Sequence, residues 1–218
     1  KPKLMDMFTN DAAMQMKIQI DKDVLYTNFN QGDAANQGAT AGAISGGYNL
    51  GTDSAAVTLT ASNILSSITA LSSVLDEANV PETDRWLIIT PTERQILMQS
   101  NLAQAQFMGD ASSVLRNGKI GSIDRFEVYV TNNLPRGAAS GTTWLSGDGS
   151  QTKAAGGTFA QKSRVIIAGH KSAISFASQF TKTETVRNPS DFGDFVRGVN
   201  VYGRKVIKDS ALATAIVY

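Results

Sequence analysis

The sequence has no cysteine and a single histidine, His170, among its 218 residues. Without cysteine the chain can form no disulfide, no thiolate zinc site and no cysteine nucleophile, a pattern typical of proteins that fold in a reducing cytoplasm. One histidine also excludes a metal site built from two histidines of the same chain. These absences remove several classes of enzyme and metalloprotein.

Charge is sparse and nearly balanced. Lysine and arginine number 20 against 19 aspartates and glutamates, so the net charge is +1. Charged residues make up 18% of the chain, below the roughly 25% usual in soluble domains. A protein that holds nucleic acid by its overall charge needs a clear basic excess, so that class is disfavoured. The low charged fraction favours a surface that contacts other protein.

The balance hides an uneven distribution along the chain. Residues 1–160 carry 11 basic and 15 acidic residues, net −4, whereas residues 161–218 carry 9 and 4, net +5. Opposite charges favour contact between these two parts, within one chain or between copies. No apolar run approaches the roughly 20 residues that span a bilayer, and the start lacks the order of a signal peptide, so we expect a soluble protein without membrane contact.

Apolar periodicity predicts four helices. Residues 10–29 carry apolar side chains at four-residue steps, and residues 60–79 form the clearest amphipathic pattern, with Ser and Thr on the face opposite the apolar one. That second face suggests that both sides of the helix contact protein. A third helix starts at Pro91 and runs to about residue 104, and a short one is expected over residues 171–178.

Alternating and apolar runs predict the strands, which are expected over residues 85–90, 125–131, 164–168, 180–187 and 211–218, with two short strands separated at Gly203 within residues 196–207. Two glycine-rich stretches separate these elements. Residues 31–51 are predicted to be a long flexible connection without a core, and residues 136–157 a hairpin or projecting loop. Without a regular strand–helix–strand rhythm or a repeat, the class is α+β.

The search for chemistry finds no catalytic, cofactor-binding or metal-binding residues. His170 could join a serine and an aspartate in a hydrolase triad, but the Gly-x-Ser-x-Gly pattern is absent and a place in a turn or at a helix start is favoured. The glycines of residues 46–51 have phosphate-loop spacing, yet Thr52 stands where the loop requires lysine.

Basic and aromatic residues interleave near the C-terminus. They are Arg187, Arg197, Arg204, Lys205 and Lys208 with Phe192, Phe195 and Tyr202. This pattern occurs in nucleic-acid binders. Neighbouring acidic residues dilute it, however, and aromatic residues at this spacing in strands are more often core or partner contacts.

Three segments carry a resemblance to a known family. They are NVPETDRWLIITPTERQILMQS (79–100), SVLRNGKIGSIDRFEVYVTNNLP (113–135) and the stretch from RVIIAGHKSAISF at residue 164 to the end. In order and spacing the chain resembles the major capsid proteins of tailed bacteriophages with the HK97-type fold. That fold combines a spine helix and β-rich peripheral domain with a mixed axial domain.

The resemblance implies a domain division. Residues 1–84 would hold peripheral-domain helices and the flexible glycine-rich loop, with the spine helix at residues 60–79. Residues 85–163 would form the axial domain, and residues 164–218 would complete it and return to the peripheral sheet. An N-terminal arm and extended loop would lie upstream of Lys1. Some relatives crosslink through an Asn at the position that matches Asp194, so self-crosslinking is not expected.

The implied function is structural, with no enzyme activity and no cofactor. Copies would assemble as pentamers and hexamers into an icosahedral shell that encloses DNA without sequence-specific binding. Scaffolding, portal or decoration proteins are further expected partners, the location is the virion capsid, and assembly takes place in the host bacterial cytoplasm. Two alternatives remain open: an encapsulin-type compartment shell, and a small serine hydrolase that uses His170.

Overall fold

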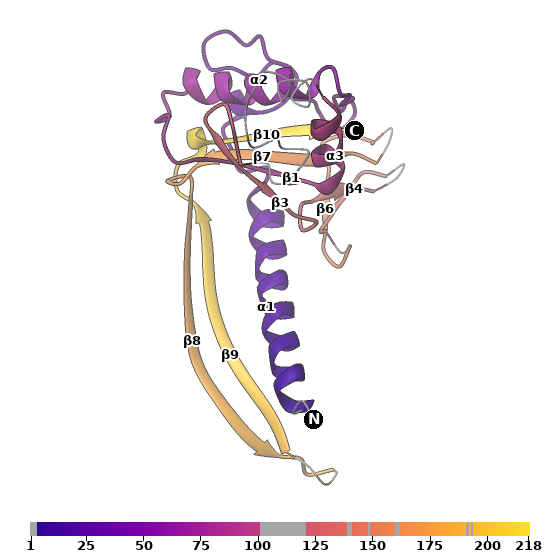
Figure 1. The fold of residues 1–218 in the computed structure, drawn as a ribbon, viewed down its shortest axis with the longest axis vertical. Coiled ribbons are helices and arrows are strands. Elements are labelled where there is room, and N and C mark those ends of the chain that lie inside the picture. The colour runs from indigo at the N-terminus through magenta and orange to yellow at the C-terminus, as the bar shows by residue number, and fades with distance from the viewer. Residues whose placement is uncertain are drawn as a thin grey trace, which may run out of the picture.

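Two long elements project from the same side of the molecule (Figure 1). One is helix α1 (Leu4–Asn28), and the other is a hairpin of strands β8 (Ile174–Arg187) and β9 (Asp194–Val206). The computed structural model describes residues 4–100, 121–138, 141–147, 149–159, 162–190, 192 and 194–218. The N-terminal end of α1 lies far from the body, whereas the C-terminus lies within it.

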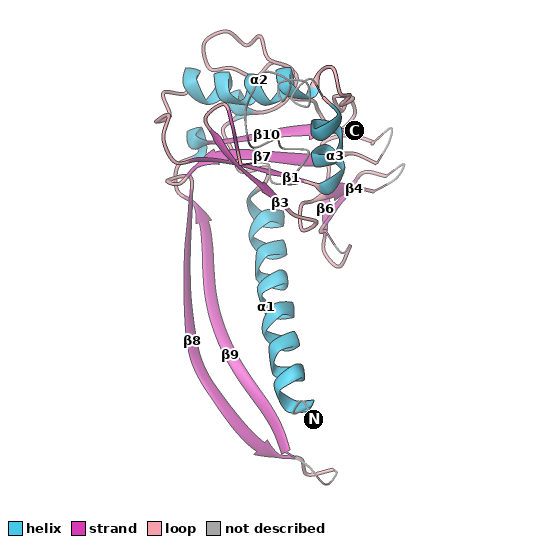
Figure 2. Cartoon of the chain, in the orientation of Figure 1, coloured by secondary structure: helices cyan, strands magenta, loops and turns pink. Residues whose placement is uncertain are grey.

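The remaining elements form the body (Figure 2). Its helices are α2 (Ile64–Glu77) and α3 (Pro91–Gln99), with the short turns η1 (Ala34–Asn36) and η3 (Asp209–Ala211). Its strands are β1 (Arg85–Ile89), β2 (Ser122–Ile123), β3 (Phe126–Val130), β4 (Arg136–Gly137), β5 (Thr143–Leu145), β6 (Thr152–Ala154), β7 (Arg164–His170) and β10 (Leu212–Val217). The mixture of helices and strands agrees with the predicted α+β class.

The body sheet is organised around β7. Its strands follow the order β2-β3-β1-β7-β4-β5-β6, and β10 also pairs with β7. β1 runs parallel to β3 and antiparallel to β7, which in turn runs antiparallel to β10. Every residue of β7 between its two ends is buried, so its unbroken apolar run belongs to a strand covered on both faces.

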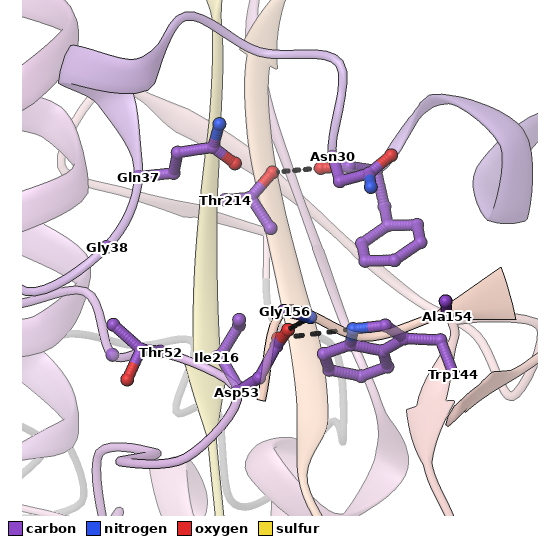
Figure 3. Close-up of a pocket in the computed structure, with 12 residues that line it drawn as sticks. Asn30, Gln37, Gly38, Thr52, Asp53, Trp144, Ala154, Gly156, Thr214 and Ile216 are labelled. Atoms are coloured by element: carbon purple, nitrogen blue, oxygen red, sulfur yellow. Dashed lines mark hydrogen bonds between the residues drawn. The ribbon is translucent and has the colours of Figure 1, made fainter. Parts of the chain in front are cut away.

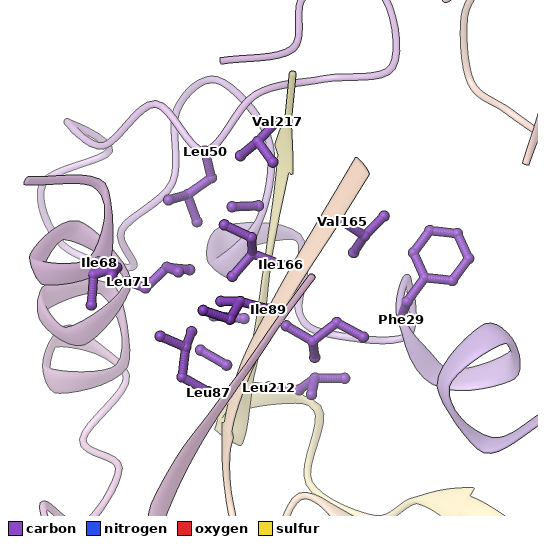
Figure 4. Packing of buried hydrophobic residues seen from close by; sticks show 14 of the residues in the cluster. Phe29, Leu50, Ile68, Leu71, Leu87, Ile89, Val165, Ile166, Leu212 and Val217 are labelled. Carbon is purple, nitrogen blue, oxygen red and sulfur yellow. The ribbon is translucent and has the colours of Figure 1, made fainter. Parts of the chain in front are cut away.

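The core fills both sides of this sheet (Figure 4). On one side α2 contributes Ile68, Leu71 and other buried residues, as its predicted apolar face requires. On the other side Phe29, just beyond the end of α1, packs edge-on against Trp144, with ring centroids 5.2 Å apart. Trp144 in turn packs against Phe159 at 4.7 Å. The predicted loop of residues 136–157 therefore contributes core as well as turns.

The hydroxyl groups on the Ser- and Thr-rich face of α2 form hydrogen bonds within the helix itself. Ser66, Thr69 and Ser73 donate hydrogen bonds to carbonyls one turn earlier in the helix, at 2.7 to 3.0 Å. The hydroxyl groups therefore have partners within the single chain. The predicted contact of this face with another protein stays a prediction.

A buried arginine joins the end of α2 to the start of β1. The Arg85 side chain has no exposed surface and binds Asp76 at 2.7 Å. It also donates to the main-chain oxygens of Val80 at 2.6 Å and Pro81 at 2.8 Å. These oxygens lie just past a helix C-terminus, where a cation is favoured. Asp76 binds Arg125 as well, and that side chain is 38% exposed.

Residues 31–51 are ordered and contribute to the core, so the predicted flexible connection is wrong. Ala41 and Leu50 are buried, and the Leu50 oxygen accepts a hydrogen bond from the Ile216 amide at 2.7 Å. Gly51 makes this approach possible: its φ is +81° and a Cβ there would lie 2.2 Å from the Ile216 oxygen. Residues 31–51 thus run along the edge of β10 and pack apolar side chains into the core.

Two predicted element types near the C-terminus are also corrected. Residues 171–178 are a turn followed by the start of β8, since Ile174 and Phe176 pair across the hairpin with Val206 and Arg204. Gly203 does not divide β9, because it pairs with Ala177 and no atom lies within 4 Å of where its Cβ would be. The long antiparallel pairing of β8 with β9 therefore outweighs both the helical composition of residues 171–178 and the tendency of Gly203 to interrupt a strand.

Candidate assembly surfaces

The part of α1 from Asn10 to Lys17 is exposed on all sides. Every residue from Asn10 to Lys17 is exposed, including Met14 at 62% and Met16 at 43%. The periodicity that predicted this helix was right about its existence, but only its last turns pack on the body. A helix this long gains most of its stability from packing, so the exposed residues 10–17 are a candidate surface for another protein.

The hairpin is exposed in a similar way. β8 and β9 pair antiparallel from Ile174↔Val206 to Arg187↔Asp194, with one irregularity between Phe180 and Lys182. Val199 and Val201 are 55% and 57% exposed. A two-stranded hairpin is at best marginally stable alone in water, and exposed apolar side chains along it are typical of an interaction surface.

A polar cluster joins the hairpin to α1, and we call it the Asp23 cluster (Asp23, Thr27, Tyr202 and Arg204). Tyr202 Oη donates to Asp23 Oδ2 at 2.8 Å. Arg204 Nη2 donates to Asp23 Oδ1 and to Thr27 Oγ1, both at 2.7 Å. Because about 180 residues separate the two sides, no sequence pattern could have indicated this cluster. The hydrogen bond to Asp23 raises the pKa of Tyr202 above its ordinary 10.0, and burial and the Asp23 charge act in the same direction.

Asp23→Ala is expected to lower the pKa of Tyr202 toward 10.0, because the acceptor of its phenolic proton is lost. In the wild type the folded state holds this proton more tightly than the unfolded state. The protonated Tyr202 phenol therefore makes its full contribution to the free energy of unfolding below pH 10.0, and this contribution is lost as pH rises through the raised pKa. Ultraviolet titration of the phenolate measures the shift, with Tyr202→Phe identifying the transition. Asp21→Ala, an exposed carboxylate on the same helix, should leave it unchanged.

An apolar groove lies where α1, the sheet and the base of the hairpin meet, and we call it the α1–β3 groove. Its volume is about 500 Å³. Apolar side chains dominate its lining, mainly Ile20, Val24, Ile88, Tyr129, Val130 and Phe176, and Asp21 lies among them. Val130 is 41% exposed and lines this groove.

The far end of the hairpin carries an exposed aromatic side chain. Phe192 is 99% exposed and lies with Arg187, Asn188, Pro189 and Ser190 around a shallow hollow. We call these residues the hairpin tip. Aromatic and arginine side chains are the types most often found at the energetic centres of protein interfaces.

A polar hollow of about 290 Å³ lies between the residues that follow α1 and strands β5, β6 and β10 (Figure 3). Asp53 accepts hydrogen bonds there from the Trp144 indole at 3.2 Å and from the Gly156 amide. Lys153 binds Asn30 at 2.6 Å, and burial lowers its pKa. The carboxylate thus has partners that fix the Trp144 ring, which indicates a structural role.

Residues 42–48 form a loop held by the end of α2. The amides of Ile44 and Ser45 donate to one carboxylate oxygen of Glu77, at 2.9 and 3.0 Å. These bonds, that of Ser45 first, lower the pKa of Glu77. The loop presents Ile44 at 81% exposure, so it is a further candidate contact surface. The glycines with phosphate-loop spacing, residues 46–51, begin in this loop, and no helix follows them directly.

His170 is the last residue of β7 and lies at a turn, as one of the two favoured readings predicted. Its Nδ1 accepts the Ser172 amide proton at 3.2 Å and lies 2.8 Å from the Ser172 hydroxyl. The helix it was expected to start is absent, because β8 begins there. A serine two residues away in the same turn stabilises the turn, and no described contact places an aspartate on His170.

The basic residues near the C-terminus, which the sequence pattern shares with nucleic-acid binders, are partly used in ion pairs within the chain. Arg204 binds Asp23, and Arg197 binds Glu184 across the hairpin, so two of the five basic residues near the C-terminus are paired within the chain. Within the described residues no group of three His, Asp or Glu side chains is placed to hold a metal ion. No described helix is both long and apolar enough to cross a membrane. The side chain of Asp194 lies outside the described residues.

Two features characterise a subunit of an assembly: apolar side chains are exposed on α1, the hairpin, β3 and residues 42–48, and the buried polar groups maintain structure. Residues 3–215 match the family described as phage capsid protein. The chain therefore belongs to the phage capsid protein family, whose members are structural rather than enzymatic. This finding excludes the reading of the chain as a serine hydrolase that uses His170.

Solved structures show the same fold. A chain from Mycobacterium phage Che8 superposes with a TM-score of 0.63 at 22% identity, covering 95% of this chain and 61% of that one. The capsid structure of the cyanophage P-SCSP1u gives a TM-score of 0.57 at 14% identity, covering 100% of this chain and 67% of that one. No curated protein gives a significant match. The chain thus spans about three fifths of the Che8 chain.

Proposed function

We propose that this chain is the major capsid protein of a tailed double-stranded DNA bacteriophage with the HK97-type fold. Its copies assemble as pentamers and hexamers into an icosahedral shell that encloses the genome. The match to the phage capsid protein family over residues 3–215 carries the proposal. The exposed apolar side chains of α1 and the hairpin support it, because a shell subunit covers such surfaces with its neighbours.

The near-neutral charge suits this function. A net charge of +1 gives the wall little general electrostatic attraction for packaged DNA, so the shell encloses the genome without holding it tightly. The protein is a component of the virion capsid and assembles in the host bacterial cytoplasm. Scaffolding, portal and decoration proteins are candidate partners in that assembly.

We propose a domain division that differs from the one expected from the sequence. The spine helix and β-rich peripheral domain correspond to α1 and the β8–β9 hairpin, which project together and meet at the Asp23 cluster. The body, including α2, corresponds to the axial domain. Supporting this division, α2 packs on the sheet that contains β7 and β10, whereas Tyr202 and Arg204 of the hairpin bind α1.

Electron microscopy and light scattering of the full-length subunit test this function. We expect large closed shells that contain DNA in the virion and expand from a smaller precursor. A stable monomer or dimer under native conditions, with no shells, would contradict the proposal. Smaller shells filled with protein would instead support the encapsulin-type alternative.

A further inference from the structure

The α1–β3 groove has the composition of a binding site for an apolar side chain. Tyr129 and Phe176 on its walls are 50% and 46% exposed, and its volume of about 500 Å³ lies within the range of roughly 300–1,000 Å³ typical of sites that enclose small molecules. Asp21 supplies a carboxylate within this apolar lining. The groove therefore suits an occupant with an aromatic group and a neighbouring positive charge.

The hairpin tip has this combination. Phe192 presents an almost fully exposed aromatic ring, and the exposed Arg187 lines the same hollow at the tip. The wider charge pattern agrees, because Arg187 belongs to the part of the chain with net charge +5 and Asp21 to the part with net charge −4. Such complementarity directs association and fixes the register of an interface.

A chain cannot place its own hairpin tip in its own groove. Phe176, which lines the groove, lies near the base of β8, and Phe192 lies beyond its far end at Arg187. The 14 residues of β8 extend about 45 Å at 3.2–3.4 Å per residue. Figure 1 shows the hairpin pointing away from the body. Groove and tip can therefore meet only between copies.

We infer that the hairpin tip of one copy occupies the α1–β3 groove of a neighbouring copy, with Phe192 among the apolar side chains and Arg187 beside Asp21. The contact joins two different patches of identical chains, so repeating it generates a ring or a continuing array rather than a closed dimer. This inference rests on the proposed self-assembly and names a contact within it.

Thiol crosslinking in assembled subunits tests the contact directly, because residues 1–218 contain no cysteine to compete with the introduced ones. One preparation carries Ser190→Cys, at the hairpin tip beside Phe192, and another, with a different tag, carries Val130→Cys. After co-assembly and treatment with a short bis-maleimide, we expect a covalent dimer that contains both tags. Val199→Cys, exposed on the same hairpin but away from the tip, replaces Ser190→Cys in the control and should give at least tenfold less dimer.

A charge exchange gives a second, independent readout. Arg187→Glu and Asp21→Lys alone should each lower the association constant about tenfold, and the double variant should recover most of it. Lys205→Glu makes the same charge change elsewhere on the hairpin and should have little effect. Recovery in the double variant separates direct contact from damage to the fold.

The outcomes distinguish this inference from the proposed function. Shells that form normally without the crosslink between positions 190 and 130, or without recovery in the double charge variant, overturn the inference and leave the capsid function standing. Crosslinking of the groove to a different segment or another protein also overturns it. If the crosslink forms in small oligomers but no shells ever appear, the contact is supported and the proposed function fails.

Discussion

Arg85→Ala is expected to lower the free energy of unfolding by about 3 kcal/mol or more, because it removes a buried cation whose partners remain. The guanidinium has no exposed surface and donates to Asp76 and to the main-chain oxygens of Val80 and Pro81. Without it, oxygen atoms at the end of α2 lose their donors, and the space left between α2 and β1 also lacks packing atoms.

Denaturant unfolding of unassembled subunits measures this change, and thermal unfolding should show a midpoint lower by about 6–12 °C for a chain of this size. Arg85→Met fills the same space but has no hydrogen-bond donor. Any loss of unfolding free energy that persists in this variant is therefore due to the missing hydrogen bonds of the guanidinium.

Arg125→Ala is the matched control, since Arg125 binds the same carboxylate of Asp76 at 3.0 Å but is 38% exposed. Exposed ion pairs contribute about 0–1 kcal/mol. Equal losses in Arg85→Ala and Arg125→Ala would show that burial of Arg85 does not determine its contribution.

The sequence predicted α2, α3, β1, β3, β7 and β10 because local patterns and burial agree in these elements. The apolar run of β7, the alternation of β3 and the one-sided pattern of α2 each follow from a strand or helix covered by the core. Arg85 illustrates the limit. It is the first residue of a predicted strand, but only the approach of the α2 C-terminus makes it a buried cation.

The assembly surfaces were less predictable, since they depend on elements distant in sequence. Residues 171–178 suggested a helix because their local composition permits one, whereas Ile174 and Phe176 belong to a strand paired with β9. The α1–β3 groove combines α1, β1, β3 and β8, so no single segment indicates it. Two global signals pointed to contact surfaces: the low charged fraction of 18%, and the opposite net charges of residues 1–160 and 161–218.

Replacing residues 180–200 with Asn-Gly is expected to abolish shell assembly while leaving the body folded. The replacement joins Gln179 to Val201, which are paired neighbours in the hairpin, and Asn-Gly supplies the two-residue turn that suits antiparallel strands. It preserves Tyr202 and Arg204, so the Asp23 cluster can still form. The shortened hairpin lacks the tip that we infer to contact a neighbouring copy.

The body should tolerate this change because the hairpin contributes little to the core. Of the described hairpin side chains, only Ile174 and Val206, at its base, pack against the core cluster. We therefore expect the free energy of unfolding to change by less than about 1 kcal/mol, whereas sedimentation should show no shells.

Phe192→Ser in the full-length hairpin separates the contribution of the tip from that of the rest of the hairpin. If it assembles normally while the shortened chain does not, the exposed length of β8 and β9 drives assembly. Shells formed by the shortened chain would show instead that α1 and the body alone assemble, and a large loss of stability would show that the hairpin is part of the folded core.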